Sequence, residues 1–413
     1  MFDKRLLILG SGEDFVELTK LAVKKGIYTV VADGLFGPAK QYASKAYTVD
    51  LNDAVAIDQI CRLEKIDHVL SSFSDYLFEM MVNISARNNL PCFCSADKVR
   101  YLRDKMLMKD MLSSLNIESA QGHLLNAETL VDINEKLSYP CVIKPLDGWG
   151  SKGMKIVYDS SELLKHVSQS SKFSTSGSLA MVESINPGHE YNVMSWIKNG
   201  KAHLLEFADR ETSGGTRQSL PYLTREAAPS YHYAELKDTV LDYLEKIAEF
   251  IGIKEGPLSM QFFYHNKKIT IGEVAGRFFG LGQGIVPVIN GINLNELLIN
   301  MLYFESDNQE ILKKTNNNLN HCSVALYLKA KKGVVRDVGN AENFITDNVD
   351  GFTLYATPGQ STSFIPWIVR IYAHFETREA ADQYCQNIYE NLFVPGLEGE
   401  NLVAENELTI YEE

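Results

Sequence analysis

Apolar segments of strand length alternate with helical segments in the first part of the chain. The pattern predicts strands over residues 5–10, 28–33 and 68–73, and helices over residues 15–25, 54–64 and 78–88. Strands that alternate with helices in this way are typical of a parallel sheet with helices on both faces. We therefore expect residues 1–95 to form a Rossmann-like α/β domain.

The turn after the first predicted strand, Gly10-Ser-Gly12-Glu-Asp, is a poor match to a dinucleotide-binding loop. Such a loop has a third glycine and presents the positive end of a helix to a pyrophosphate. Here Glu13 and Asp14 occupy the start of the helix, where their carboxylates repel an anion. We expect a Rossmann-like sheet that binds no dinucleotide.

The middle of the chain is richer in strands. Strands are predicted over residues 140–144, 154–158, 179–183, 191–197 and 203–208, and a hairpin over 257–264 and 268–273. Helices are predicted over residues 97–115, 161–168, 233–251 and 293–303, and a long glycine- and proline-rich loop over 209–230. After a polar linker at Asn316 the pattern is strand-rich and ends in a helix over 377–391. We expect a second domain over 96–315 and a small α+β domain over 316–413.

The net charge of the chain narrows the class of partner. At −13, it disfavours nucleic acid or an anionic membrane, because both attract a basic surface. No apolar run reaches the roughly eighteen residues that a membrane span needs. The six cysteines are scattered without a metal-binding spacing, and we expect them to be reduced thiols in a cytoplasmic protein.

A glycine-rich stretch, Gly148-Trp-Gly150-Ser-Lys-Gly153, lies between two predicted strands. A dinucleotide site needs a helix after the glycines, whereas a glycine flap between antiparallel strands can cover a triphosphate from above. Ser151 and Lys152 add donors at the tip, and Lys144 on the entering strand can reach phosphate oxygens. A surface hairpin with a mobile tip remains the alternative. The kinase motifs and the P-loop pattern are absent from the sequence.

Two later stretches carry residues suited to a nucleotide and its metal. The stretch "MVESINPGHEYNV" places Glu183 and Glu190 around a Pro-Gly turn, where a hinge can bind adenine and a carboxylate can bind ribose. The predicted hairpin places Gln261 and Glu273 on paired strands, and oxygen ligands so arranged can hold Mg²⁺ against phosphates. Arg277 follows and can neutralise charge on a transferring phosphoryl group.

With these three stretches in this order, the chain resembles the ATP-grasp carboxylate–amine ligases. The branch it is most similar to contains carbamoyl-phosphate synthetase, biotin carboxylase, purine-pathway enzymes and L-amino-acid ligases. The resemblance covers essentially the whole chain. It implies a Rossmann-like pre-ATP-grasp domain, an ATP-grasp body with a flap subdomain over about residues 120–195, and a C-terminal α+β domain.

The resemblance also implies a role for each motif residue. By this resemblance, the phosphates are bound by Lys105, Lys144 and the flap residues Gly150, Ser151, Lys152 and Gly153. Adenine is bound by Glu183, Ser184 and Ile185, and ribose by Glu190. The metal is bound by Gln261 and Glu273, and Arg277 and Lys144 assist catalysis. The cofactors would be ATP and Mg²⁺, with Mn²⁺ as an alternative. Ala275 stands where the family usually has asparagine, and because a methyl group cannot bind a metal, the number of ions, one or two, stays open.

The family reaction joins a small-molecule carboxylate to an amine through an acyl phosphate. Arg210, Arg217 and Arg225, from the predicted loop, are candidates for binding a substrate carboxylate. We expect an amino acid or small peptide as substrate. Two alternatives stay open: a purine-pathway-like ligase or carboxylase that acts on a ribonucleotide, and a catalytically weak ATP-binding regulator. A homodimer is expected only by analogy with relatives.

Overall fold

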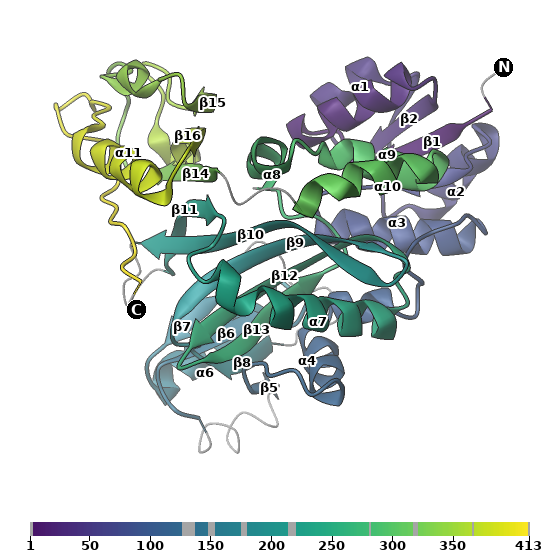
Figure 1. Ribbon diagram of the computed structural model, residues 1–413, viewed down its shortest axis with the longest axis horizontal. Helices are drawn as coiled ribbons and strands as arrows, with labels where there is room; N and C mark the ends of the chain where they lie inside the picture. The colour runs from purple at the N-terminus through teal and green to yellow at the C-terminus, as the bar shows by residue number, and fades with distance from the viewer. Residues whose placement is uncertain are drawn as a thin grey trace.

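Three β-sheets organise the protein in its computed structural model, which describes residues 3–125, 137–147, 153–174, 180–213, 220–280, 282–316, 321–365 and 367–411. Within these ranges the sheets are a four-stranded sheet in the order β3-β2-β1-β4, an eight-stranded sheet in the order β13-β12-β9-β10-β11-β14-β16-β15, and a four-stranded sheet in the order β5-β8-β6-β7. Figure 1 shows the first sheet at one end of the molecule and strands β14 to β16 at the other, with the long strands of the large sheet between them.

The first sheet is parallel, as the alternation of strands and helices predicts. Its strands are β1 (Arg5–Leu9), β2 (Tyr28–Asp33), β3 (Lys45–Thr48) and β4 (His68–Leu70). The helices of this region are α1 (Val16–Lys24), α2 (Ala54–Leu63) and α3 (Asp75–Arg87). The central strand β1 is almost entirely buried, whereas the edge strand β3 is largely exposed. The sequence did not predict β3 because its side chains lack a buried, apolar face.

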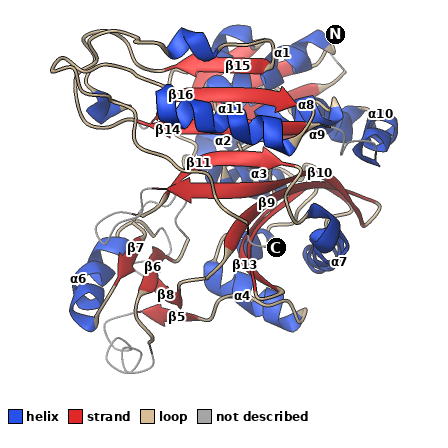
Figure 2. Cartoon of the chain, turned by 60° about the vertical axis from the view of Figure 1, so that its left-hand side comes forward, coloured by secondary structure: helices blue, strands red, loops and turns tan. Residues whose placement is uncertain are grey.

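The small antiparallel sheet contains the strands on either side of the glycine flap. Its strands are β5 (Gly122–Leu125), β6 (Cys141–Pro145), β7 (Lys155–Val157) and β8 (Ala180–Ser184). Helix α6 (Ser160–Ser171) packs on this sheet, and α4 (Lys105–Ser114) lies beside β5. Strands β6 and β7 pair in antiparallel fashion, which confirms the predicted strand–loop–strand order. Figure 2 shows this sheet as a separate layer facing the large sheet.

The large sheet spans the second and third predicted domains. Its strands are β9 (His189–Lys198), β10 (Lys201–Ser213), β11 (Tyr222–Ala228), β12 (Glu255–His265), β13 (Lys268–Ala275), β14 (Cys322–Lys329), β15 (Val349–Leu354) and β16 (Trp367–Phe375). Helix α7 (Tyr233–Ile251) packs on β9, β10 and β12, and α11 (Arg378–Asn391) on β14 and β16. The predicted hairpin of β12 and β13 is confirmed.

Two predictions of local structure are wrong. The region 209–230 is not one long loop, because β10 continues to Ser213 and β11 begins at Tyr222, and the two pair with each other. These strands do not show an apolar alternation because several of their buried side chains are charged. Sheet pairing and ion pairs bury these charged side chains. The single helix predicted over 97–115 is also broken, because Asp104 caps a new helix, α4, with its carboxylate on the N–H groups of Met106 and Leu107.

Helices α8 (Gly282–Asn290), α9 (Leu294–Tyr303) and α10 (Glu305–Leu312) connect the large sheet to the N-terminal region. Helix α8 packs on the large sheet, and α9 packs on α1. Among the described residues, no single helix is long and apolar enough to cross a membrane. The pair α8 and α9 passes that test only jointly, by length and composition, and the two helices are bent by 85°.

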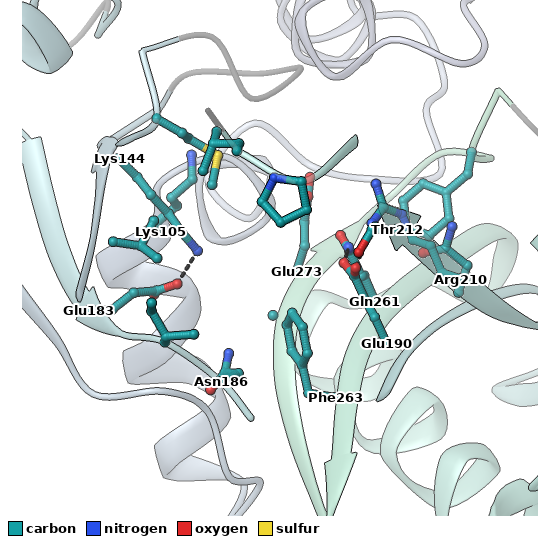
Figure 3. Close-up of a pocket in the computed structure, with 18 of the residues that line it drawn as sticks. Lys105, Lys144, Glu183, Asn186, Glu190, Arg210, Thr212, Gln261, Phe263 and Glu273 are labelled. Atoms are coloured by element: carbon teal, nitrogen blue, oxygen red, sulfur yellow. Dashed lines mark hydrogen bonds and ion pairs between the residues drawn. The ribbon is translucent and has the colours of Figure 1, made fainter. Parts of the chain in front are cut away.

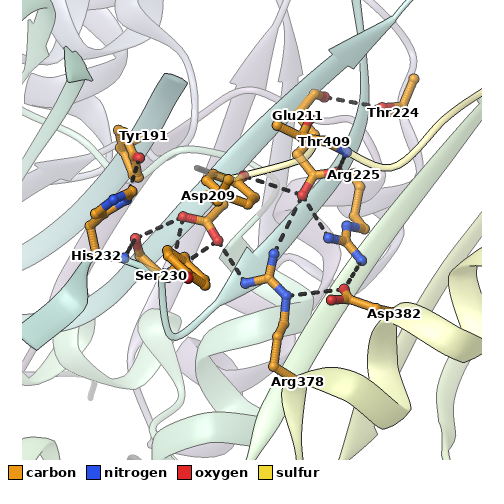
Figure 4. Close-up of polar contacts among 12 residues, drawn as sticks. Tyr191, Asp209, Glu211, Thr224, Arg225, Ser230, His232, Arg378, Asp382 and Thr409 are labelled. Carbon is orange, nitrogen blue, oxygen red and sulfur yellow. Dashed lines mark hydrogen bonds and ion pairs between the residues drawn. The ribbon is translucent and has the colours of Figure 1, made fainter. Parts of the chain in front are cut away.

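A buried network of ion pairs joins β10 and β11 to helix α11, and Figure 4 shows it. Arg225 donates to Glu211 at 2.6 Å and to Asp382 at 2.5 Å, and its side chain is only 1% exposed. Arg378, on α11, pairs with Asp209 at 2.6 Å and with Asp382 at 3.0 Å. Arg225, proposed from sequence as a ligand for a substrate carboxylate, therefore has its guanidinium inside this network instead.

We expect Arg225→Ala to destabilise the protein, because it leaves the buried Glu211 carboxylate without its strongest partner. Breaking a buried ion pair on one side lowers the free energy of unfolding by about 3–5 kcal/mol. Urea unfolding at pH 7 measures this loss in the free energy of unfolding. The matched control is Lys246→Ala, which removes an exposed partner of Asp242, and such surface pairs contribute about 1 kcal/mol or less. Equal losses for the two variants would contradict the structural role of Arg225.

Candidate active site

A cavity of about 790 Å³ lies between the small antiparallel sheet and the large sheet. One wall carries residues of β6, β7 and β8, and the opposite wall carries residues of β9, β10, β12 and β13. Figure 3 shows Lys105, Lys144 and Glu183 on one side and Glu190, Gln261 and Glu273 on the other. The volume is in the range of roughly 300–1,000 Å³ that is usual for small-molecule and cofactor sites.

A buried carboxylate and two lysines make up the polar part of the small-sheet wall. The ammonium group of Lys144, on β6, forms an ion pair with Glu183, on the neighbouring strand β8. Lys109, on α4, lies 3.0 Å from the other oxygen of the same carboxylate. Burial raises the pKa of Glu183, but the charges of Lys144 and Lys109 outweigh this effect and the pKa lies below its usual value. Glu183 is therefore an anion held between two cations.

Lys105 is the first residue of α4 and lies in the same cavity. Its backbone N–H and its ammonium group both donate to the carbonyl oxygen of Leu146, at 3.2 and 3.4 Å. Burial lowers the pKa of Lys105, and the nearby carboxylate of Glu273 offsets this only in part. The two lysines that the sequence assigned to phosphates, Lys105 and Lys144, thus line one cavity.

The large-sheet wall presents oxygen atoms. Gln261, on β12, is directly opposite Glu273, on β13, in the strand register. The Gln261 amide donates to one oxygen of Glu190, and Arg210 lies 2.5 Å from the other oxygen. All four side chains line the cavity. The pairing of Gln261 with Glu273 gives two oxygen ligands on adjacent strands, and Arg210 is adjacent to the proposed ribose-binding carboxylate.

The oxygen atoms of this wall suit Mg²⁺ when a second ligand supplies further oxygens. The described part of the chain contains no group of three or more His, Cys, Asp or Glu side chains that could hold a metal ion. Mg²⁺ usually binds through one or two carboxylates together with substrate phosphates rather than in an all-protein cage. Ala275 is fully buried on β13 and adds no ligand. Gln261 and Glu273 therefore suit a metal that reaches the site with a polyphosphate.

Arg277 lies at the end of the cavity nearest the first sheet. Its guanidinium forms a two-point ion pair with Asp75, the first residue of α3, in which Nε lies 2.8 Å from Oδ1 and Nη2 contacts Oδ2. Both residues line the cavity, as does Arg103. Burial raises the pKa of Asp75, but the charges of Arg277, Arg103 and Lys105 more than reverse this, so the pKa lies below its usual value. The sequence pattern did not single out Asp75.

The remaining predicted residues fall into three groups. Ser184 and Ile185 line the cavity directly after β8. Gly153 precedes β7 with a φ of +76°, where a side chain would meet Phe173, so this position requires glycine. Gly150, Ser151, Lys152 and Arg217 lie outside the described residues.

Sequence patterns also failed to indicate Lys109, which pairs with the cavity residue Glu183, and the lining residues Thr409 and Tyr411. Lys109 is one turn after Lys105 on α4, so its helical spacing could have indicated it. Thr409 and Tyr411 reach the cavity from the end of the chain, where the Thr409 N–H and the Tyr411 hydroxyl donate to Glu211 at 3.3 and 3.2 Å. No sequence motif marks these last two residues, because their position follows only from the path of the folded chain.

Comparison with known proteins identifies a domain in the middle of the chain. Residues 137–284 match the model of the ATP-grasp domain. The formate-dependent phosphoribosylglycinamide formyltransferase of Methanocaldococcus jannaschii is 22% identical over 286 residues, which are 66% of this chain and 69% of that protein. Its counterpart from Bacteroides fragilis is 26% identical over 163 residues, which are 39% of this chain but only 42% of the relative's length.

Two solved structures share the fold over nearly the whole chain. The L-amino acid ligase from Bacillus licheniformis has a TM-score of 0.79 at 18% sequence identity and covers 95% of this chain and 99% of its own. Phosphoribosylglycinamide synthetase from Anaerococcus prevotii has a TM-score of 0.70 at 17% identity, with 95% and 99% covered. The predicted fold class is confirmed. Residues 137–284 thus match the ATP-grasp domain, and the chain shares its overall fold with these two solved structures.

Proposed function

We propose that the protein is an ATP- and Mg²⁺-dependent carboxylate–amine ligase that forms an amide bond, and that an amino acid is one substrate. The observation that supports this most strongly is the opposition of two lysines to a pair of oxygen ligands across one cavity. Cations on one wall suit a triphosphate, and carboxylate and amide oxygens on the other suit its metal.

In this proposal ATP lies along the cavity with its phosphates between Lys105, Lys144 and the hairpin of β12 and β13. The adenine binds against Glu183, Ser184 and Ile185, and the ribose hydroxyls bind Glu190. The flap residues Gly150, Ser151, Lys152 and Gly153 cover the phosphates. Glu190 can take part because each carboxylate oxygen has two lone pairs, while Arg210 and Gln261 use one on each oxygen.

The metal is proposed to bind Gln261 and Glu273. When bound, Mg²⁺ offsets the charge of the phosphates and orients them for in-line transfer. The fully buried methyl group of Ala275 supports a single tightly bound ion, because the chain offers no third ligand on β13.

The reaction then proceeds in two balanced steps. A carboxylate oxygen of the first substrate attacks the γ-phosphorus, the bond to the bridging oxygen breaks, and ADP leaves with an acyl phosphate as the product. The amine of the second substrate attacks the acyl carbon, loses a proton, and releases inorganic phosphate. Arg277 and Lys144 offset negative charge while carboxylate and triphosphate approach each other, and a closed flap excludes water from the acyl phosphate.

The charge of the cavity favours an amino acid over a ribonucleotide as substrate. Five Lys or Arg and five Asp or Glu side chains line it among the described residues. Three of the five acids, Asp75, Glu183 and Glu190, pair with cations of the cavity, and Glu211 pairs with Arg225 in the ion-pair network. A second phosphorylated ligand beside ATP would need further cations. An amino acid, which carries one positive and one negative charge, needs none.

The fold shared with an L-amino acid ligase supports the same choice, and Arg210 is better placed than Arg225 to bind the substrate carboxylate because Arg210 lines the cavity. The sequence match to formyltransferases of a phosphoribosyl substrate favours a ribonucleotide as the second candidate. A catalytically weak ATP-binding regulator remains a third reading, for which Ala275 is the observation. Cytoplasmic location and a homodimer are further proposals.

A phosphate-release screen tests the substrate class. The purified protein, with ATP and Mg²⁺, is offered pairs of amino acids in one arm and phosphoribosylamine-type ribonucleotides with formate or bicarbonate in another, and products are identified by mass spectrometry. We expect phosphate release that depends on two amino acids. The product should have the summed mass of the two amino acids minus one water. Turnover only in the ribonucleotide arm would overturn the amino acid assignment, and ATP binding without turnover in any arm would favour a regulator.

Lys144→Ala tests the phosphate site. We expect the affinity for a non-hydrolysable ATP analogue to fall by about 10- to 100-fold, because a charge-assisted hydrogen bond contributes about 1.5–3 kcal/mol. Isothermal titration calorimetry measures it. Lys165→Ala is the matched control, since Lys165 is an exposed lysine on α6 of the same subdomain. Unchanged nucleotide affinity in Lys144→Ala would remove Lys144 from the phosphate site.

Glu273→Gln tests the metal site. The amide keeps the size of the side chain but removes the negative charge that attracts Mg²⁺, so we expect Mg²⁺-dependent ADP release to become undetectable with a melting temperature near that of the wild type. Glu245→Gln, which alters an ion pair with Lys201 on the surface, is the control and should leave turnover intact. Full activity in Glu273→Gln at every Mg²⁺ concentration would contradict the assignment.

A further inference from the structure

A salt bridge joins the first sheet's domain to the catalytic cavity. Asp75 begins α3, and Arg277 follows the last residue of β13 by two positions, so the contact connects residues 202 positions apart in the chain. The side chain of Arg277 is 13% exposed and that of Asp75 is 9% exposed, and both face the cavity. The wall at this end of the cavity is therefore shared between two regions of the fold.

Arg277 retains two unused donors after its contacts within the described residues are counted. A guanidinium has five N–H donors. Nε and Nη2 donate to the two oxygens of Asp75, and Nη1 donates to the carbonyl oxygen of Phe278 at 3.1 Å. The ring of Phe279 lies 5.1 Å from the guanidinium carbon and packs against it. The guanidinium is thus fixed in orientation, with one donor on each terminal nitrogen left for a ligand.

Asp75 is itself held in place by its local backbone. Ser74 caps α3, with its hydroxyl accepting from the N–H of Leu77, and so fixes the helix start. The preceding residue, Phe73, has a φ of +62°, which is unfavourable for a bulky side chain. Such strain is typical of turns that present a functional residue. The positive end of the α3 dipole also favours the ionised carboxylate.

We propose that Asp75 is a positioning residue for the ligase reaction. It holds Arg277 so that the two remaining N–H donors meet an oxygen of the reacting carboxylate and of the acyl phosphate formed from it. Because the donors are set before the substrate arrives, little reorganisation accompanies the charge that develops during transfer. This inference rests on the proposed function, and it makes the first sheet's domain a part of the active site.

The charge of Asp75 distinguishes this role from a purely structural one. Replacing Asp75 by asparagine removes one negative charge from the cavity, so the attraction of the cavity for a triphosphate increases. The same change releases Arg277 from its fixed orientation, so turnover decreases. Nucleotide affinity is then kept or increased while turnover decreases, whereas a loss of folding would decrease both.

The experiment compares the full-length wild type with Asp75→Asn. We expect kcat to fall by about 10- to 100-fold, the range usual for residues that orient an active-site group, while the dissociation constant for a non-hydrolysable ATP analogue stays equal or decreases. Asp58→Asn is the matched control, because Asp58 pairs with Arg87 on the surface of the same domain. It should change neither quantity.

A double-mutant cycle with Arg277→Lys shows whether Asp75 acts through Arg277. We expect Asp75→Asn to have little further effect once Arg277 is lysine, since residues that act as a unit are non-additive. Equal fold-losses of kcat in both backgrounds, or wild-type kcat in Asp75→Asn, would overturn the inference.

Crystal structures of the wild type and Asp75→Asn decide the positioning role without any turnover. We expect the Arg277 guanidinium to leave its place beside Phe279 in the variant, and an unmoved guanidinium would overturn the inference. If the wild type turns over none of the substrate pairs, the proposed function fails, and the position of Arg277 in the two structures still tests the role of Asp75.

Discussion

The pairing of three cavity cations with internal anions is the constraint on which the rest of the site depends. Lys144 is held by Glu183, Arg210 by Glu190 and Arg277 by Asp75. Without these partners, several cations would lie within one cavity and repel one another at low dielectric. With them, the cavity is electrically balanced among its described residues. In the proposed function a triphosphate enters together with Mg²⁺, which offsets part of its negative charge.

These ion pairs also explain why the fold brings together such distant parts of the chain. The acids and bases of one pair usually belong to different elements: β6 and β8 for Lys144 and Glu183, β9 and β10 for Glu190 and Arg210, and α3 and the end of β13 for Asp75 and Arg277. Each pair therefore joins two elements as well as neutralising a charge. The large sheet extends the arrangement, since β11 pairs with β14 and links the cavity wall to the strands of the C-terminal region.

Several residues that line the candidate cavity could be predicted from sequence because their signals are local. Lys144, Glu183 and the Gln261–Glu273 hairpin each lie in a short stretch whose residue types suit one chemical task. The two wall motifs do line the same cavity. The outer helices and the parallel sheet were also predictable, since apolar periodicity there follows burial directly.

The features that sequence could not supply are those set by contacts between distant residues. Asp75 gains its importance only because α3 begins beside Arg277. Arg225 was a reasonable substrate ligand by residue type, yet α11 supplies Asp382 and, with Glu211, encloses it. The same network buries the charged residues of β10 and β11, which is why these strands looked like a loop. In each case a polar side chain is buried by a partner that no local pattern reveals.

We propose that one cavity holds a nucleotide between the small antiparallel sheet and a metal on the large sheet. A crystal structure with a non-hydrolysable ATP analogue and Mn²⁺, with anomalous diffraction to locate the metal, tests it most directly. We expect an anomalous peak within coordination distance of Gln261 and Glu273, with phosphate oxygens near Lys105 and Lys144. A nucleotide bound elsewhere, or a metal that contacts neither Gln261 nor Glu273, would contradict it.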